Sequence, residues 1–536
     1  MTRYRHLITD DNRKWWTLGA MCFALFMIML DNTIVNVALP SIQKDLGASI
    51  SGLEWTINGY TLSFAVLLAT GGRLGDIFGR RLMFLIGVVI FALSSATAGF
   101  APDETALVLS RVVQGVGAAL MMPGTLSIIT DAFPAHERGK AMGTWAGVSA
   151  LALAIGPVLG GFLTEHVSWR AIFYVNIPVA IGAVLATLFA VRESRDTSVG
   201  REVDYAGVAV LTVGLTALVL ALVEGNAWGW GSPEVVGLLG LAALALPAFV
   251  FVENRVKAPM VQFDLLSDRN FLAAVCVAMV ISFAMLGVFF FLALYMQDIL
   301  RYSPLEAGVR FLPSTLMIVA VAPISGRLSD RFGPRWLIAG GLTIVAASLF
   351  SFSHIAVDST YLDLLPGFML LGIGIAMTMS PMTSAAMNAV PVQKAGIASG
   401  VLSMFRMVGG SLGVAVTGAI FQGLVSSKLD SLLGGSGVTA GQQEAISDQL
   451  GGGSLEKVPG VDPAQAKQVA AAGREAFVYA LGHAMTVSGF VALVGALIGA
   501  TAIRAKTRTR TTVEAATAEA NPGGEGVAAE EAVRTA

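Results

Sequence analysis

The decapeptide Gly72-Arg73-Leu74-Gly75-Asp76-Ile77-Phe78-Gly79-Arg80-Arg81 returns later in the chain as Gly326-Arg327-Leu328-Ser329-Asp330-Arg331-Phe332-Gly333-Pro334-Arg335, with seven of ten positions identical. Each copy is a short polar break between two long apolar runs. A segment that recurs in equivalent surroundings indicates a duplicated unit. Its glycines permit a tight turn, and its charged side chains can pair with one another or anchor a surface.

Around the two copies, apolar runs follow one another along almost the whole chain. A membrane-spanning helix needs about 20 mostly apolar residues. Runs of this kind fall at 17–39, 53–72, 82–100, 105–126, 142–163, 171–191, 205–223, 234–252, 271–297, 311–326, 336–354, 361–380, 396–424 and 477–503. Fourteen helices, an even number, place both termini on one side, and the two decapeptides face that same side. The sequence therefore predicts an all-α polytopic membrane protein with a parallel internal repeat, as in transporters built from two halves.

The composition excludes several classes of protein. Only 13% of the 536 residues are charged and 55% are hydrophobic, whereas a soluble domain carries about a quarter charged residues. The near balance of 34 basic and 36 acidic residues gives no attraction for a polyanion, so a nucleic-acid partner is excluded. Apolar blocks without alternation exclude an outer-membrane barrel. Cys22 and Cys276 lie inside apolar runs and are expected to be buried thiols.

The distribution of basic residues predicts the orientation. With the N-terminus inside, inner segments hold 24 of the 34 Lys and Arg residues, outer loops hold 8, and spans hold 2. The positive-inside rule therefore predicts a multi-pass protein of the cell membrane with both termini in the cytoplasm. We interpret the long outer loop at about 425–476 as a surface insertion with a helix-like stretch near 463–476. The tail at 511–536 is expected to be disordered.

Five motifs resemble those of the major facilitator superfamily, and within it the fourteen-helix drug:proton antiporters. The decapeptide resembles the superfamily's signature loop. The other four are Leu30–Pro40 (LDNTIVNVALP), the helix-4 arginine motif Arg111–Gly117 (RVVQGVG), an antiporter motif that runs from Gly147 to Gly161, and Trp169–Pro178 (WRAIFYVNIP). The resemblance covers roughly residues 15–424 and the last helix, and it implies a proton-coupled exporter that works by alternating access.

The same resemblance implies a division of the chain. Two six-helix halves are expected at 1–193 and 261–510, with an inserted helix pair in 194–260. We interpret that pair, spans 205–223 and 234–252, as lipid-facing filler because no charge lies inside it.

The repeated decapeptide is predicted to act as a cytoplasmic gate, since ion pairs at helix ends can hold one conformation and release another. A simple positive-inside anchor is the alternative. The residues assigned to the gate loops are Gly72, Arg73, Asp76, Gly79, Arg80, Arg81, Gly326, Arg327, Asp330, Gly333 and Arg335.

Charges in the middle of a span are costly and therefore functional candidates. Three are identified: Asp31, Arg111 and Arg406. At 1.5 Å per residue, Asp31 and Arg111 lie about 12 Å and about 9 Å below the same membrane edge. We expect Asp31 to carry the proton, with Arg111 and Gln114 tuning it; a static ion pair that fixes helix packing is the alternative. Arg406 is assigned to substrate contact or coupling, or to pairing with backbone carbonyls.

The acids point to a substrate class. No second carboxylate is expected to be buried in the C-terminal half, since Asp298 and Glu306 are placed near the outer rim and Glu224 at a helix end. The predicted substrate is therefore a lipophilic molecule that is neutral, weakly acidic or amphipathic, in preference to a permanent dication.

The antiporter motif is predicted to form a packed, bendable seam that limits leakage. Small residues let helices approach closely, and a proline bends a helix. Ordinary glycine-rich helix packing is the alternative. The residues concerned are Gly147, Gly156, Pro157, Gly160 and Gly161.

A hydrophobic substrate cavity is the last predicted feature. Aromatic and polar side chains and adaptable methionines suit varied ligands, although packing explains each of them as well: Tyr60, Trp145, Tyr295, Gln297, Met377 and Met379. The chain has no phosphate-binding loop, no hydrolase motif and no metal cluster, so neither catalytic residues nor a cofactor other than the transported proton is expected. An importer of a small nutrient and, more remotely, a membrane-embedded enzyme are the alternative functions, and no oligomer is required.

Overall fold

The computed structural model describes residues 10–134, 137–195, 204–256, 259, 261, 263–390, 395–433 and 463–504, and this part of the chain is helical with no strand. The helices are α1 Asp10–Leu46, α2 Ile50–Phe78, α3 Arg80–Gly99, α4 Glu104–Ala132, α5 Arg138–His166, α6 Ala171–Tyr174, α7 Asn176–Ala190, α8 Tyr205–Trp228, α9 Pro233–Glu253, α10 Phe263–Leu266, α11 Arg269–Leu294, a π-helix Tyr295–Ile299, α12 Pro304–Arg310, α13 Leu312–Phe332, α14 Pro334–Phe352, α15 Tyr361–Asn388, α16 Ala395–Leu433 and α18 Pro463–Ala502.

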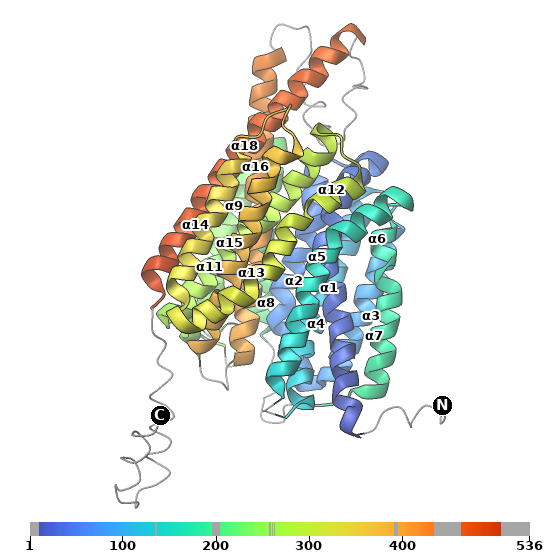
Figure 1. Cartoon of the computed structure of the whole chain (residues 1–536), viewed down its shortest axis with the longest axis vertical. Coiled ribbons are helices and arrows are strands. Elements are labelled where there is room, and N and C mark those ends of the chain that lie inside the picture. Colours follow the sequence, from blue (N-terminus) through green and yellow to red (C-terminus); the bar gives the residue numbers. More distant parts are fainter. Residues whose placement is uncertain are drawn as a thin grey trace, which may run out of the picture.

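Fourteen helical segments are long and apolar enough to cross a membrane, and each coincides with one of the predicted runs. The start of α1 and the end of α18 lie at the same end of the bundle (Figure 1). We call this the inner end and the opposite one the outer end. The predicted fold class, an all-α protein with fourteen spanning helices, is confirmed.

The two sets of six spans pack in the same way. In the N-terminal set, α1 packs on α5 and α7, while α4 packs on α2 and α3. In the C-terminal set, α11 packs on α16 and α18, while α15 packs on α13 and α14. Between the sets, α2 lies along α16 and α5 lies along α12. This pattern is that of a parallel repeat, although the exact domain boundaries at 193 and 260 stay a prediction.

The repeated decapeptides have matching backbones. Gly79 between α2 and α3 has φ +121°, and Gly333 between α13 and α14, at the equivalent position, has φ +84°. Both values lie where an L side chain is strained, so glycine is required at both turns. The identity seen in the sequence therefore corresponds to one local structure used twice.

Two interpretations of the loops and of the helix pair change. Residues 425–433 and 463–476, predicted as parts of the outer loop, are helical and extend α16 and α18 above the other helices (Figure 1). The helix-like stretch at 463–476 is confirmed; residues 434–462 and the tail 511–536 lie outside the described part. α8 packs against both α2 and α16, one helix of each half, so it lies between the halves and is not only lipid-facing. α9 packs mainly on α8, and its contact with lipid stays a prediction.

The two halves are closed against each other at the outer end. Among the described residues, hydrogen bonds join them from Gln297 Nε2 to the Val37 carbonyl (2.8 Å), from the Leu305 amide to Glu165 Oε2 (3.0 Å), from Ser411 Oγ to Asn58 Oδ1 (2.9 Å) and from Gln422 Nε2 to Glu54 Oε1 (3.2 Å). Ser411 lies near the middle of α16, and the other groups lie nearer the outer ends of their helices. The structure is therefore an outer-closed state.

Candidate functional site

A buried polar cluster lies in the middle of the N-terminal half. Arg111 Nη1 on α4 lies 2.5 Å from Asp31 Oδ2 on α1 and donates to Gln114 Oε1 at 2.7 Å. Gln114 Nε2 in turn donates to Asp31 Oδ1 at 2.9 Å. Arg111 and Gln114 are one helical turn apart, so both reach the same carboxylate. The structure thus brings together the three residues predicted for proton coupling.

A second layer of contacts holds this cluster. Asn176 Nδ2, at the start of α7, lies 3.3 Å from Asp31 Oδ1 and donates to Ser95 Oγ on α3 at 3.0 Å. Arg111 Nε donates to the Thr56 carbonyl at 3.0 Å. Five helices therefore meet at one carboxylate. Asn176 and Ser95 were not identified from the sequence, because single uncharged polar residues are common in spanning helices; Asn176 does lie within the motif Trp169–Pro178.

The cluster is fully shielded in this state. Asp31 is 1% exposed, Arg111 2%, and Gln114 and Asn176 0%. The Tyr60 ring covers the Arg111 guanidinium at 4.3 Å. A buried ion pair is tolerated when further hydrogen bonds satisfy it, and losing one partner is strongly destabilising. The arrangement can hold a proton away from solvent and give it up only if the helices separate.

Glu54 and Asp298 are buried acidic side chains that were not predicted from the sequence. Glu54 on α2 is 0% exposed inside a spanning helix, and Asp298 in the π-helix is 8% exposed. The prediction that no second carboxylate is buried in the C-terminal half is therefore wrong: Asp298 lies near the outer rim, as expected, but is buried within the π-helix. Glu54 is a buried acid of the N-terminal half that α16 covers. A dicationic substrate is therefore no longer disfavoured by a lack of buried acids.

The antiporter motif on α5 has two faces. A Cβ on Gly156 would lie 1.9 Å from Thr33 Oγ1 on α1, and one on Gly160 would lie 2.7 Å from the Ile34 carbonyl. On the other face, a Cβ on Gly161 would lie 2.4 Å from the Pro304 carbonyl at the start of α12.

The contact between α5 and α12 is close in both directions. A Cβ on Gly308 of α12 would lie 2.1 Å from the Pro157 carbonyl of α5. Gly147, nearer the inner end of α5, is exposed, and nothing lies within 4 Å of its Cβ position. The motif therefore packs the helix of Asp31 on one side and the opposite half on the other, and Gly147 takes no part in this packing.

Arg406 on α16 is partly exposed although it lies near the middle of its span. Its Nε has no hydrogen-bond partner, and no ion pair to Arg406 forms within the described part of the chain. A guanidinium without a counter-charge at this depth is costly unless it faces water or ligand. Arg406 is thus a charged cavity candidate with free bonding capacity.

The other predicted cavity residues lie in varied surroundings. Tyr60 covers Arg111 and belongs to the buried cluster. Tyr295 is 0% exposed and donates to the Ala356 carbonyl at 2.6 Å. Gln297 bridges the halves. Met377 points at Gly340 of α14, 3.8 Å from where a Cβ would lie.

The two remaining candidates, Met379 and Trp145, are partly buried. Met379 packs on the hydrophobic core. Trp145 is partly buried, and its Nε1 has no partner in the described residues. The structure therefore does not gather these side chains around one cavity, and the assignment of a common substrate cavity stays a prediction.

The N-terminal gate loop ties helix ends within its own half. Arg80 donates from Nε to Asp76 Oδ1 (3.0 Å) and from Nη1 to Asp131 Oδ2 (2.9 Å). Glu193, after α7, accepts from the amides of Arg81 (3.0 Å) and Leu82 (3.1 Å) at the start of α3. A carboxylate at a helix N-terminus is favourable. These contacts hold together the inner ends of four helices, α2, α3, α4 and α7.

In the C-terminal loop, the Arg335 guanidinium lies 4.9 Å from the Trp336 ring, and Arg327 is exposed. A Cβ on Gly326 would lie 3.2 Å from Ser380 Oγ in the same half. The side chain of Asp330 lies outside the described part. Gating by these loops stays a prediction.

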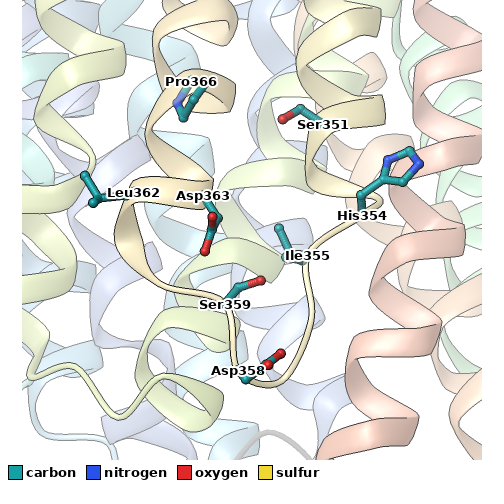
Figure 2. Close-up of a pocket in the computed structure, with 8 residues that line it drawn as sticks. All are labelled: Ser351, His354, Ile355, Asp358, Ser359, Leu362, Asp363 and Pro366. Carbon is teal, nitrogen blue, oxygen red and sulfur yellow. The ribbon is translucent and has the colours of Figure 1, made fainter.

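A separate pocket of about 520 Å³ lies at the outer turn between α14 and α15. Figure 2 shows its polar lining, which includes His354, Asp358, Ser359 and Asp363. Asp363 caps its own helix by accepting from the Thr360 amide at 2.7 Å. This pocket is open and remote from the Asp31 cluster, so it is not the transport site.

Two curated relatives resemble the chain over most of its length. It is 36% identical over 489 residues, 91% of each chain, to the tetracenomycin C resistance and export protein of Streptomyces glaucescens. It is 40% identical over 424 residues, 78% of this chain and 84% of the relative, to a puromycin resistance protein of Streptomyces alboniger.

A solved structure agrees on the fold. A bacterial homologue of the human lysosomal transporter Spinster, in an inward-facing and occupied conformation, matches with a TM-score of 0.62 and 17% identity, covering 92% of this chain and 98% of that one. The model of the Major Facilitator Superfamily matches residues 21–414. With the repeated halves and the relatives above, this match shows that the chain is a multi-pass membrane protein that belongs to the major facilitator superfamily.

Proposed function

We propose that this protein is a proton-coupled exporter of lipophilic antibiotics or related toxic metabolites. The observation that carries the proposal is the shielded Asp31–Arg111–Gln114 cluster inside one half of a two-half transporter. The relatives named for resistance and export support the direction of transport. The distribution of basic residues supports a cell-membrane location with both termini in the cytoplasm.

Alternating access requires that proton and substrate favour different states. In the outer-closed state Asp31 is shielded and held by three polar side chains. Rocking of the halves would separate α2 from α16 and α5 from α12 and admit water to the carboxylate. We propose that Asp31 takes up a proton from the outside, that Arg111 is released from it, and that the proton leaves on the inner side as substrate binds.

A panel of toxic compounds tests the proposal directly. The chain is expressed in a bacterial host that lacks its main efflux pumps, and growth is measured with tetracenomycin C, puromycin, actinorhodin and ethidium. The exporter account predicts raised tolerance to at least one compound together with lower accumulation in the cell. Unchanged tolerance to all four, or increased accumulation, would contradict export and favour an importer.

Arg406 is proposed to contact the substrate from α16. Arg406→Gln should raise the concentration for half-maximal transport of an acidic panel compound by roughly tenfold to a hundredfold, because a hydrogen bond to a charged group contributes about 1.5–3 kcal/mol. For a neutral compound, this concentration should rise much less. Arg406→Lys should preserve most of the transport of the acidic compound. Equal losses for both compounds would assign Arg406 to packing instead.

A further inference from the structure

We propose that Glu54 is a second proton-binding site, separate from Asp31, whose protonation holds the outer end of α2 against α16. The inference rests on the proposed exchange of protons for substrate. Glu54 lies on α2 of the N-terminal half, and its carboxyl faces the backbone of α16 in the C-terminal half. It is therefore placed to respond to the separation of the halves.

The carboxyl of Glu54 is enclosed and poorly satisfied. The side chain is 0% exposed, its Oε1 accepts one hydrogen bond from Gln422 Nε2 at 3.2 Å, and its Oε2 has no partner. No ion pair to Glu54 forms within the described part of the chain. Burying an unpaired carboxylate costs far more than burying the neutral acid. In the outer-closed state Glu54 is therefore protonated.

The surrounding charges do not alter this conclusion. Glu224 on α8 accepts a hydrogen bond from Trp55 Nε1 at 3.1 Å. Glu104 on α4 accepts from the Ser49 amide at 3.0 Å. Trp55, which holds Glu224, is the residue next to Glu54, and a negative charge nearby disfavours a further one.

The described basic groups on the neighbouring helices do not pair with Glu54. Arg406 lies on α16 but is twelve residues from Gly418, about 18 Å along the helix at 1.5 Å per residue. Arg111 on α4 is bound to Asp31 on α1. Lys428, nearer the outer end of α16, lies 3.1 Å from Glu475. Because Arg111 and Lys428 already pair with other acids, neither stabilises an ionised Glu54, and the closed site favours the neutral acid.

Gly418 explains why the site depends on the conformation. A Cβ at this position of α16 would lie 2.0 Å from Glu54 Oε1, so the carboxyl rests directly on the helix backbone. Asn58 and Ser411, one turn deeper, join the same two helices. When the outer end opens, α16 leaves and water reaches the carboxyl, which can then ionise.

Protonation of Glu54 and closure of the outer end should favour each other. Because the closed outer end accepts only the protonated form, protons stabilise closure, and loss of the proton opens the outer end. For one proton, the ratio of closed to open molecules should fall by up to about tenfold for each unit of rising pH within the titration range. An acidic exterior would thus return the emptied carrier to the outer-closed state.

The test needs no substrate. The full chain, with Cys22→Ala and Cys276→Ala, is labelled with nitroxides at Val167→Cys, directly after α5, and at Leu362→Cys on α15, both exposed outer positions. After reconstitution in lipid, the label distance is measured by pulsed electron resonance from mildly acidic to mildly alkaline pH. We expect the population with the short label distance to fall as pH rises. In Glu54→Gln, which mimics the neutral acid, this population should stay high at every pH.

Three further variants separate the alternatives. Glu104→Gln, an equivalent change confined to one half, should keep the pH dependence. Asp31→Asn, which removes the other proposed proton site, should keep the part of the pH dependence that Glu54 contributes. Glu54→Asp should keep it with a shifted midpoint. A pH-independent distance in the unsubstituted protein, or a pH response in Glu54→Gln as large as in the unsubstituted protein, would overturn the proposal. Because this assay uses neither substrate nor gradient, it can fail while drug export stands, and it can succeed if export is absent.

Discussion

Asp31→Asn is expected to abolish proton-driven export while the protein still reaches the membrane. The asparagine side chain has the same shape and keeps an oxygen that can accept from Arg111, but it cannot bind and release a proton. Arg111 also loses its counter-charge, so stability should fall, since breaking a buried pair costs about 3–5 kcal/mol. Transport under an imposed pH gradient, corrected for the amount of protein in the vesicles, measures the effect.

A matched control lies on the same helix. Asp45, at the outer end of α1, accepts hydrogen bonds from Trp169 and Arg170 and is largely solvent-exposed. Asp45→Asn removes an acid and an ion pair without touching the buried cluster, and surface pairs contribute little. It should transport nearly as well as the unsubstituted protein. If Asp31→Asn also retained full proton coupling, the cluster would be a static ion pair.

Gly308→Ala should also stop transport, by a different route. The added methyl group would lie 2.1 Å from the Pro157 carbonyl, where only backbone could yield. Overpacking of this kind costs typically about 1–3 kcal/mol, and here the cost falls on the outer-closed state alone. The ratio of closed to open molecules should drop by roughly fivefold to a hundredfold, since about 1.4 kcal/mol is tenfold. Label distances across the outer end measure this shift.

Gly147→Ala is the internal comparison for that experiment. Gly147 lies in the same antiporter motif, but nothing lies within 4 Å of its Cβ position. Alanine is also the better helix former by about 1 kcal/mol. We expect normal distances and normal export. Loss of export in Gly147→Ala with the outer end still closed would show that the motif acts through something other than close helix contact.

The sequence predicted the proton site well because its members are charges in otherwise apolar spans. Helical rise alone places Asp31 and Arg111 at similar depths, and Gln114 lies one turn from Arg111. Tyr60 was assigned to the cavity, but it lies against Arg111 instead. Which face of α2 the ring occupies depends on the packing of α4, which helical periodicity does not define.

Glu54 could not be recognised as buried for a similar reason. It lies one turn from the outer end of α2, where an acid is normally solvated. Its burial comes from α16, more than 350 residues away in the sequence, and from Gly418, whose missing side chain leaves the space. Asn176 and Ser95 were missed because a neutral polar residue in a span gives no distinct signal. The repeated decapeptide, by contrast, encodes its turn locally through Gly79 and Gly333.

The most direct test of the central claim is uptake into inside-out vesicles with an acidic lumen. The probe is the panel compound against which the chain protects most strongly, and its amount in the lumen is followed by mass spectrometry. The account predicts accumulation that requires the acidic lumen, disappears with a protonophore and is absent in Asp31→Asn. Accumulation that persists without a proton gradient, or that is unchanged in Asp31→Asn, would contradict it.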